Sequence, residues 1–199
     1  MTYVIGLTGG IGTGKSLCTK ILAEKGITVI DADSVGHLVL LPGGEAYDSV
    51  VANFGCVLPD GKIDRAALGK IVFSDPEKLA LLNSITHPAI RLRIEKMIRA
   101  AKGIVLLECA LLFESGFDMM ADEIWLVTAQ ETIREERIMK RNNLPREGAK
   151  ARIAAQSDYN EYIPKCRVIL ENNRTAEEFS HKVEAAYLNL LERTNYENV

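Results

Sequence analysis

A run of glycines near the start of the chain constrains its fold more than any other feature. Five glycines fall within the nine residues 6–14, and Lys15 and Ser16 close the run. The apolar residues 3–8 before it are typical of a buried strand, and helix formers follow it. Glycine weakens regular structure but permits backbone angles and close approaches that a side chain forbids. The run therefore predicts a strand, a loop and a helix, with the loop backbone close to a ligand.

Residues 9–16 fit the pattern G-x-x-x-x-G-K-[ST] of a phosphate-binding loop, in the strand and helix context that the pattern requires. Backbone N–H groups and the positive end of the helix would hold the β- and γ-phosphates of a nucleotide. Lys15 would neutralise charge during phosphoryl transfer, and the Ser16 hydroxyl would bind Mg2+. The alternative interpretation is a glycine-rich turn that binds nothing.

Composition limits the classes of protein to consider. Of the 199 residues, 47% are hydrophobic and 26% are charged, as in globular proteins with a substantial core. The net charge of -3 argues against nucleic-acid binding through a broad basic surface. The four cysteines form no CxxC pair, so no zinc site or redox pair is expected. The sequence has neither a signal-peptide pattern nor an apolar run of membrane length, so we expect a cytoplasmic protein without a membrane partner.

Short apolar runs that alternate with helical patterns predict a parallel α/β sheet covered on both faces. The strands are expected at 3–8, 27–31, 104–108, 123–128 and 166–170. More than 70 residues separate the second strand from the third, so residues 34–103 are expected to form an inserted helical region. Capping boxes at Ser74 with Glu77 and at Thr175 with Glu178 predict two helix starts. Pro88 is expected to restart a helix that runs to Gly103.

A basic segment follows the fourth strand. Residues 131–152 hold seven basic and four acidic side chains, a net charge of +3, and Asn142, Asn143 and Pro145 are expected to divide the segment into two helices. One interpretation is a solvated pair of charged helices. The other, which we favour, is a lid that closes arginines over the phosphoryl group and excludes water. Arg137 and Arg141 share a helix face at i, i+4 spacing.

Two aspartates, Asp31 and Asp33, follow the second strand, where open α/β sheets bind ligands. Carboxylates near a triphosphate are repelled unless Mg2+ or a hydroxyl proton compensates their charge. We therefore expect Asp33 to accept or orient the proton of an attacking alcohol. Either residue could instead be an N-cap of the next helix, a role that Asp favours.

Three other segments carry candidate side chains. In THPAIR, His87 and Arg91 would share a helix face, where Arg91 could bind a phosphate, or the His-Pro pair could only cap a helix. Glu108 lies where a carboxylate near Mg2+ is expected, after the third strand. Phe113 could stack on a base or fill the core, and Glu114 follows it beyond the sheet edge.

The order and spacing of several motifs resemble the dephospho-coenzyme A kinase family over nearly the whole chain. The motifs are GLTGGIGTGKS, DADSVGH, FSDPEKLALLNSITHPAIR, LLFESG, the arginine helix, ARIAAQ and a closing ENN. The resemblance implies ATP-dependent phosphorylation of the ribose 3'-hydroxyl of dephospho-CoA to give coenzyme A, the last step of its biosynthesis. It also implies a P-loop kinase fold, with a five-stranded parallel sheet flanked by helices. In that fold 1–33, 104–130 and 162–199 would form the nucleotide-binding core, 34–103 would bind the acceptor, and 131–161 would be the lid.

The resemblance also assigns residues. Lys15, Asp33, Arg137 and Arg141 would be catalytic. ATP would contact Gly10, Gly12, Thr13, Gly14, Lys15, Ser16 and Leu17, with Asn172 near the adenine. The acceptor would meet Thr8, Asp33, His87, Arg91, Phe113 and Glu114. The chain departs from the family pattern at Leu17, Glu108, Ala110, Arg134 and Arg167, where Thr, Asp, Pro, Gln and Asp are usual or common. Leu17 is still expected to offer its backbone N–H, whereas the longer Glu108 puts its contact with Mg2+ or water in doubt.

Two competing functions remain open at this stage. Another small-molecule kinase of the same fold, such as a nucleoside monophosphate kinase, would use a different acceptor. A nucleotide-dependent switch would hydrolyse nucleotide slowly and change its affinity for partners, but no N-K-x-D base-reading motif follows the later strands.

Overall fold

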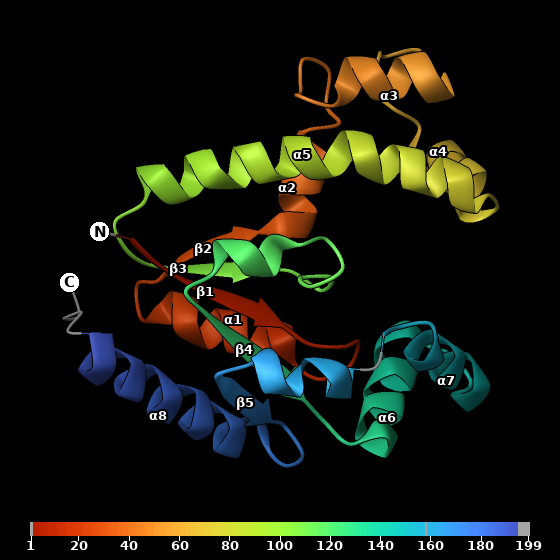
Figure 1. Cartoon of the computed structure of the whole chain (residues 1–199). Helices are drawn as coiled ribbons and strands as arrows, with labels where there is room; N and C mark the ends of the chain where they lie inside the picture. Colours follow the sequence, from red (N-terminus) through yellow and green to blue (C-terminus); the bar gives the residue numbers. More distant parts are fainter. Residues whose placement is uncertain (1, 158, 195–199) are drawn as a thin grey trace. The chain divides into compact units, whose positions relative to one another are not determined.

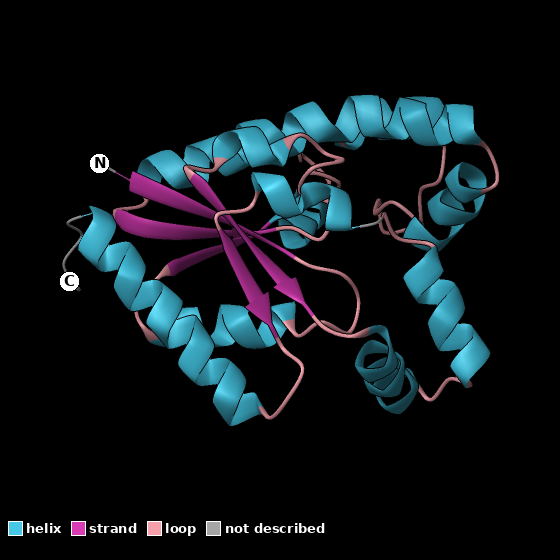
Figure 2. Ribbon diagram, turned by 60° about the horizontal axis from the view of Figure 1, so that its bottom comes forward, coloured by secondary structure: helices cyan, strands magenta, loops and turns pink. Residues whose placement is uncertain are grey.

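The structure is a computed structural model that describes residues 2–157 and 159–194. Its five strands form one sheet in the order β2-β3-β1-β4-β5 (Figures 1 and 2). The strands are β1 (Thr2–Thr8), β2 (Thr28–Asp31), β3 (Gly103–Glu108), β4 (Glu123–Thr128) and β5 (Val168–Glu171). β1 pairs in parallel with β3 and β4, and β4 pairs in parallel with β5. The predicted five-stranded parallel sheet is confirmed, and every strand starts within two residues of its predicted start.

Helices connect these strands. They are α1 (Lys15–Glu24), α2 (Ala32–Leu38), α3 (Tyr47–Phe54), α4 (Arg65–Phe73), α5 (Pro76–Ala100), α6 (Glu131–Asn142), α7 (Arg146–Ala154) and α8 (Ala176–Thr194), with short 3-10 helices η1 (Phe117–Met120) and η2 (Tyr159–Lys165). Among the described residues, no helix combines the length and apolar character needed to cross a membrane.

The chain divides into two compact units. The described residues up to Val29 and from Ala101 onward form one unit, and Ile30–Ala100 form the other. In the first unit α1 and α8 lie side by side on one face of the sheet (Figure 1). Their apolar residues pack on Trp125 and the other inward side chains of the strands, and Phe179 of α8 is fully buried there. This core fixes the carboxyl end of β1, where the glycine-rich loop begins.

The second unit consists of α2 to α5. The 25-residue helix α5 packs against each of the other three. It runs through Pro88 without a break, so the prediction that Pro88 restarts a helix is wrong. A proline inside a helix removes one backbone hydrogen bond, and burial of helix faces such as that of Ile94 can offset this cost.

The cap of α5 also differs from the prediction. Asp75, rather than Ser74, accepts hydrogen bonds from the N–H groups of Glu77 and Lys78, at 3.0 and 3.3 Å. Ser74 Oγ instead donates to the carbonyl of Lys70 at the end of α4. The capping box was placed one residue early because Ser and Asp are both good caps and stand next to each other.

Other local predictions are confirmed. Thr175 Oγ1 accepts the N–H of Glu178 at 3.2 Å at the start of α8. Asn143 takes a left-handed conformation with φ of 49° and ends α6, and α7 begins after Pro145.

A buried carboxylate at the start of β4 explains one departure from the family pattern. Glu123 accepts hydrogen bonds from Tyr3 Oη at 3.0 Å, Trp125 Nε1 at 2.6 Å and Arg193 Nη2 at 2.9 Å. Nε of Arg167 lies 3.6 Å from the same carboxylate. A basic residue at position 167 therefore adds to the neutralisation of a buried charge, which an aspartate there would oppose.

Candidate active site

The loop between β1 and α1 has a backbone that glycine makes possible. Gly12 and Gly14 have φ of 81° and 103°, in the left-handed region. A Cβ atom on Gly14 would lie 2.2 Å from Nδ2 of Asn172. Because α1 begins at the next residue, Lys15, the positive end of that helix adjoins the loop. The loop can therefore present N–H groups and a helix N-terminus to an anion.

Lys15 is held by a carboxylate at the end of β3. Its Nζ atom forms an ion pair with Oε1 of Glu108, and Thr19 Oγ1 donates to Oε2 of Glu108 at 2.6 Å. The side chains of Lys15 and Glu108 are only 15% and 12% exposed, so solvent screens the pair weakly. The sequence placed Glu108 in this area but gave no signal for Thr19. A phosphate that binds Lys15 has to compete with Glu108.

The two residues after Lys15 have different surroundings. Ser16 is exposed at the start of α1. Leu17 packs against the core, and its N–H donates to the Gly14 carbonyl at 3.0 Å. The first turn of α1 therefore already uses the N–H that Leu17 was expected to offer to a nucleotide.

The oxygen atoms of Ser16 and Glu108 fit the chemistry of Mg2+. Hydroxyl and carboxylate oxygens are the hard donors that this ion prefers. Within residues 2–157 and 159–194, no group of three or more His, Cys, Asp or Glu side chains is placed to hold a metal. Mg2+ needs no such group, because it keeps several waters and takes other ligands from bound phosphates.

Arg137 and Asn172 contact the loop through its carbonyl oxygens. Arg137 Nη1 donates to the carbonyls of Gly12 and Thr13 at 3.2 and 3.3 Å, and its Nη2 donates to Oδ1 of Asn172 at 3.1 Å. Nδ2 of the buried Asn172 donates to the Thr13 carbonyl at 2.8 Å. Burial lowers the pKa of Arg137. Both predicted residues are therefore at the loop, where they hold its backbone.

Arg141 lies one turn after Arg137 on α6 and is exposed. Its Nε donates to Oδ1 of Asn142 at 3.2 Å. The i, i+4 pair is thus divided in this structure, with one arginine engaged by the loop and the other at the surface.

Two residues at the loop were not predicted to be site residues. Arg134 Nε donates to the Ile11 carbonyl at 2.9 Å, and Gln156 Oε1 accepts the Ile11 N–H at 2.7 Å. Both line a cavity of about 430 Å³ that Gly10 and Thr13 also line. The sequence marked Arg134 only as a departure from the family and Gln156 only as part of a motif. A hydrogen bond to a distant backbone carbonyl leaves no sequence pattern.

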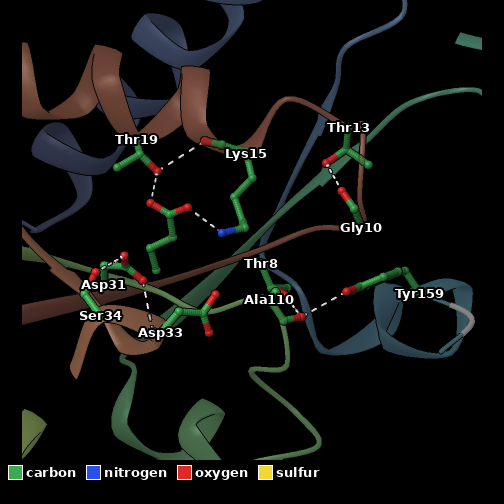
Figure 3. Close-up of polar contacts among 11 residues, drawn as sticks. Thr8, Gly10, Thr13, Lys15, Thr19, Asp31, Asp33, Ser34, Ala110 and Tyr159 are labelled. Carbon is green, nitrogen blue, oxygen red and sulfur yellow. Dashed lines mark hydrogen bonds and ion pairs between the residues drawn. The ribbon is translucent and has the colours of Figure 1, made fainter. Parts of the chain in front are cut away.

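Thr8, at the end of β1, is buried and donates to the Ala110 carbonyl at 3.2 Å. The hydroxyl of Tyr159 donates to the same carbonyl at 2.9 Å (Figure 3). Burial, followed by the negative charge of Glu114, raises the pKa of Tyr159 to about 12, so it remains a donor at neutral pH. These bonds fix the start of the loop after β3.

The same loop carries Phe113 and Glu114. The ring of Phe113 stacks on Tyr162 of η2, with centroids 4.1 Å apart and planes at 17°. It is half-buried, so it does not simply fill the core, and stacking on a base stays a prediction. Glu114 Oε1 accepts a hydrogen bond from Ser157 Oγ at 2.6 Å. Sequence reasoning missed these partners, which follow α7.

The second unit holds the two aspartates. Asp31 is the N-cap of α2 and accepts hydrogen bonds from the Asp33 N–H at 3.0 Å and from Ser34 Oγ at 2.6 Å (Figure 3). The capping interpretation is therefore correct for Asp31. Asp33 lies in the first turn of α2 with an exposed side chain, so its carboxylate is accessible to a substrate hydroxyl.

His87 and Arg91 lie four residues apart on the continuous helix α5, as predicted for one face. Both are half-buried. Burial and then the charge of Arg91 lower the pKa of His87, which favours a neutral imidazole. Because α5 runs through this segment, the His-Pro pair does not cap a helix.

Comparisons with known proteins give one consistent family. A family model described as dephospho-CoA kinase matches residues 3–178. A dephospho-CoA kinase of Carboxydothermus hydrogenoformans is 44% identical over 87% of this chain and 87% of its own length. Another, of Geobacter sulfurreducens, is 41% identical over 91% of this chain and 95% of its own.

A solved structure agrees with the sequence comparisons. The dephospho-CoA kinase of Campylobacter jejuni superposes with a TM-score of 0.74 at 27% identity, covering 98% of this chain and 100% of its own. The similarity thus extends over both compact units and the segment from α6 to α7.

Proposed function

Because this chain belongs to the dephospho-CoA kinase family, we propose that it transfers the terminal phosphoryl group of ATP to the ribose 3'-hydroxyl of dephospho-CoA, which gives coenzyme A and ADP. The single observation that carries the proposal is the match over residues 3–178, which includes the phosphate-binding loop, Asp33 and the arginines of α6. A phosphate-binding loop by itself is common to many nucleotide-binding proteins, whereas this match spans the acceptor residues as well.

In the proposed reaction Asp33 acts as the general base. Its carboxylate takes the proton of the 3'-hydroxyl as the oxygen forms a bond to the γ-phosphorus, and the bond from that phosphorus to the β,γ-bridging oxygen breaks. Support comes from its exposed carboxylate in the first turn of α2. Asp31 would contribute indirectly, because its cap fixes the backbone that carries Asp33.

Lys15, Arg137 and Arg141 would stabilise the charge of the transferring group. For Lys15 this requires exchange of its Glu108 partner for phosphate oxygens. Arg137 can act while it donates to the Gly12 and Thr13 carbonyls, since a guanidinium has five N–H donors, and Arg141 is exposed. Residues 131–161, which carry both of these arginines, would act as the lid.

Mg2+, when bound, would neutralise phosphate charge, with Ser16 as the protein ligand and the Glu108 carboxylate available to a bound water. Nucleotide phosphates would meet the N–H groups of Gly10, Gly12 and Gly14, and Asn172 would support the adenine side of the site. Thr13 would lie beside the phosphates, with its N–H donated to the Gly10 carbonyl at 3.2 Å.

Five further residues are proposed to bind the acceptor. Thr8, Phe113 and Glu114 belong to the first unit, and His87 and Arg91 belong to the second unit, Ile30–Ala100. Arg91 suits an anionic group of the acceptor, since a guanidinium forms two parallel bonds with a phosphate. A neutral His87 beside it can donate or accept a hydrogen bond without adding repulsion.

The proposal is tested by ADP release from Mg-ATP with dephospho-CoA, AMP, CMP, GMP or water alone. The expected result is coupled turnover with dephospho-CoA only, and a product that mass spectrometry shows to carry one added phosphate. Turnover with a nucleoside monophosphate would indicate a different kinase. Slow hydrolysis that no acceptor accelerates would indicate a switch protein.

A further inference from the structure

A phosphate-binding loop works only if its carbonyl oxygens face away from the anion, because each carbonyl carries negative partial charge. In this chain every carbonyl from Gly10 to Gly14 accepts a hydrogen bond. The Gly10 carbonyl accepts from Thr13 Oγ1 at 2.8 Å (Figure 3), and the Gly14 carbonyl accepts from the Cys18 N–H at 3.2 Å. The three carbonyls between them accept from the side chains of Arg134, Arg137 and Asn172.

Ile11, the residue after Gly10, is held at both of its backbone polar groups. Arg134 Nε donates to its carbonyl at 2.9 Å, and Oε1 of Gln156 accepts its N–H at 2.7 Å. Arg134 Nη2 also donates to Gln156 Oε1 at 3.1 Å. Arg134 lies on α6 and Gln156 lies after α7. Together with the backbone of Ile11, their side chains form a closed ring of three hydrogen bonds. Burial of the guanidinium lowers the pKa of Arg134, which marks a charge removed from water.

A second observation places Arg134 against the same loop. A Cβ atom built on Gly10 would lie 2.6 Å from Nη2 of Arg134 and 3.0 Å from Oε1 of Gln156. The arginine thus occupies the space that a side chain at position 10 would need. A side chain at position 10 would therefore have to displace Arg134 or Gln156, whereas the backbone of Gly10 is not left-handed.

We propose that Arg134, paired with Gln156, is a positioning residue that fixes the Ile11 peptide so that the loop carbonyls stay turned away from the nucleotide phosphates. The proposal deepens the proposed function and rests on its ATP site. It assigns a purpose to a position where the chain departs from the family pattern. In this proposal the start of α6 holds the phosphate-binding loop, whereas the rest of the helix carries the arginines proposed to close over the phosphoryl group.

The test measures equilibrium binding of Mg-ATP in the absence of an acceptor, together with thermal unfolding without nucleotide. For Arg134→Ala we expect the Kd of Mg-ATP to rise about tenfold, the size expected for a lost charge-assisted hydrogen bond. The unfolding midpoint should stay close to that of the wild type. Arg134→Lys, which keeps the charge and can reach one carbonyl, should recover part of the affinity. Lys140→Ala, which removes an exposed charge from the same helix, should bind as the wild type does.

Gly10→Ala provides an independent test through the close contact. It should displace the guanidinium and raise the Kd of Mg-ATP to the level of Arg134→Ala. The double variant should bind no more weakly than either single variant, because both changes remove the same ring of hydrogen bonds. A Gly10→Ala protein that binds as the wild type does, or a double variant with additive losses, would overturn the proposal.

Two other results would also overturn it. One is an Arg134→Ala protein with a Kd within twofold of the wild type. The other is a loss of affinity for Mg-ATP in Arg134→Ala that a lower unfolding midpoint of the variant accounts for. The Kd of Mg-ATP is measured without an acceptor, so it tests the role of Arg134 even if dephospho-CoA proves not to be a substrate. Failure of the positioning role and failure of the proposed kinase reaction can therefore be told apart.

Discussion

The phosphate-binding loop and the helical unit Ile30–Ala100 carry function in different ways. In the loop the functional groups are backbone N–H groups, and the left-handed backbone of Gly12 and Gly14 that presents them is itself part of the fold. In the helical unit the candidate groups are side chains on α2 and α5, whose backbones form helices whatever those side chains are. Substitution of Gly12 or Gly14 should therefore change stability and binding together, whereas substitution of the candidate side chains in the helical unit should mainly change activity.

Asp33→Asn gives the largest expected effect and the clearest case of activity alone. We expect kcat to fall about 100-fold or more, since amide nitrogen and oxygen cannot take the hydroxyl proton. The KM for ATP and the unfolding midpoint should change little, because the side chain is exposed and Asn has nearly the same shape as Asp, without its charge near the helix N-terminus. Steady-state kinetics and a thermal melt on the same preparation measure all three. Wild-type turnover in this variant would remove Asp33 from the role of base.

Gly14→Ala is the corresponding test in the loop, where both properties should change. The residue has φ of 103°, and its Cβ would lie 2.2 Å from Asn172 Nδ2, which holds the Thr13 carbonyl. We expect a loss of about 1–3 kcal/mol in unfolding free energy from the strain. A Kd for Mg-ATP more than about tenfold weaker should accompany it. Denaturant unfolding and ATP titration measure the two quantities, and a variant that loses affinity at unchanged stability would contradict the comparison.

The sequence predicts features that depend on local residues better than features that depend on contacts between distant residues. The strand positions, the loop and the break at Asn143 could be predicted because they depend on local apolar runs, glycine and turn residues. The predicted helix start at Pro88 is wrong because packing along α5 offsets the cost of a proline inside a helix. Such packing is not visible in a local sequence pattern. Ser74 was chosen over Asp75 because both residues suit a cap.

The site could be predicted only in part, for a similar reason. Motifs indicate Lys15 and Asp33 as candidates, because the chemistry proposed for them requires a given residue at a given spacing. Arg134 and Tyr162 act through a carbonyl and a ring that lie far away in the sequence, so their contacts become visible only when the chain is folded. The side chain of Asn172 binds the loop backbone, a contact that the motif does not indicate, and its place near the adenine stays a prediction.

Arg91→Ala tests the helical unit at a binding residue. We expect the KM for dephospho-CoA to rise about tenfold through loss of a charge-assisted contact with the acceptor. The KM for ATP should be unchanged, and the unfolding midpoint should shift by less than about 4 °C. Arg99→Ala, which removes an exposed arginine from the last turn of the same helix, is the matched control. Equal rises in both KM values would indicate a general defect and contradict an acceptor role for Arg91.

The smallest expected effect concerns the charge of His87. Burial and then Arg91 lower its pKa below the ordinary value of 6.5. As pH falls, the unfolded chain therefore takes up the proton first, so the stability that His87 contributes is full above pH ~6.5 and is lost as the pH falls through the folded-state pKa. NMR titration, with the resonance assigned through His87→Gln, should give a midpoint below 6.5 in the wild type and a higher one in Arg91→Ala, because one of the two causes has been removed. A midpoint that Arg91→Ala leaves in place would mean that burial alone sets the charge of His87. In that case the charge of Arg91 would not influence the protonation of His87, and each residue would contact the acceptor independently of the other.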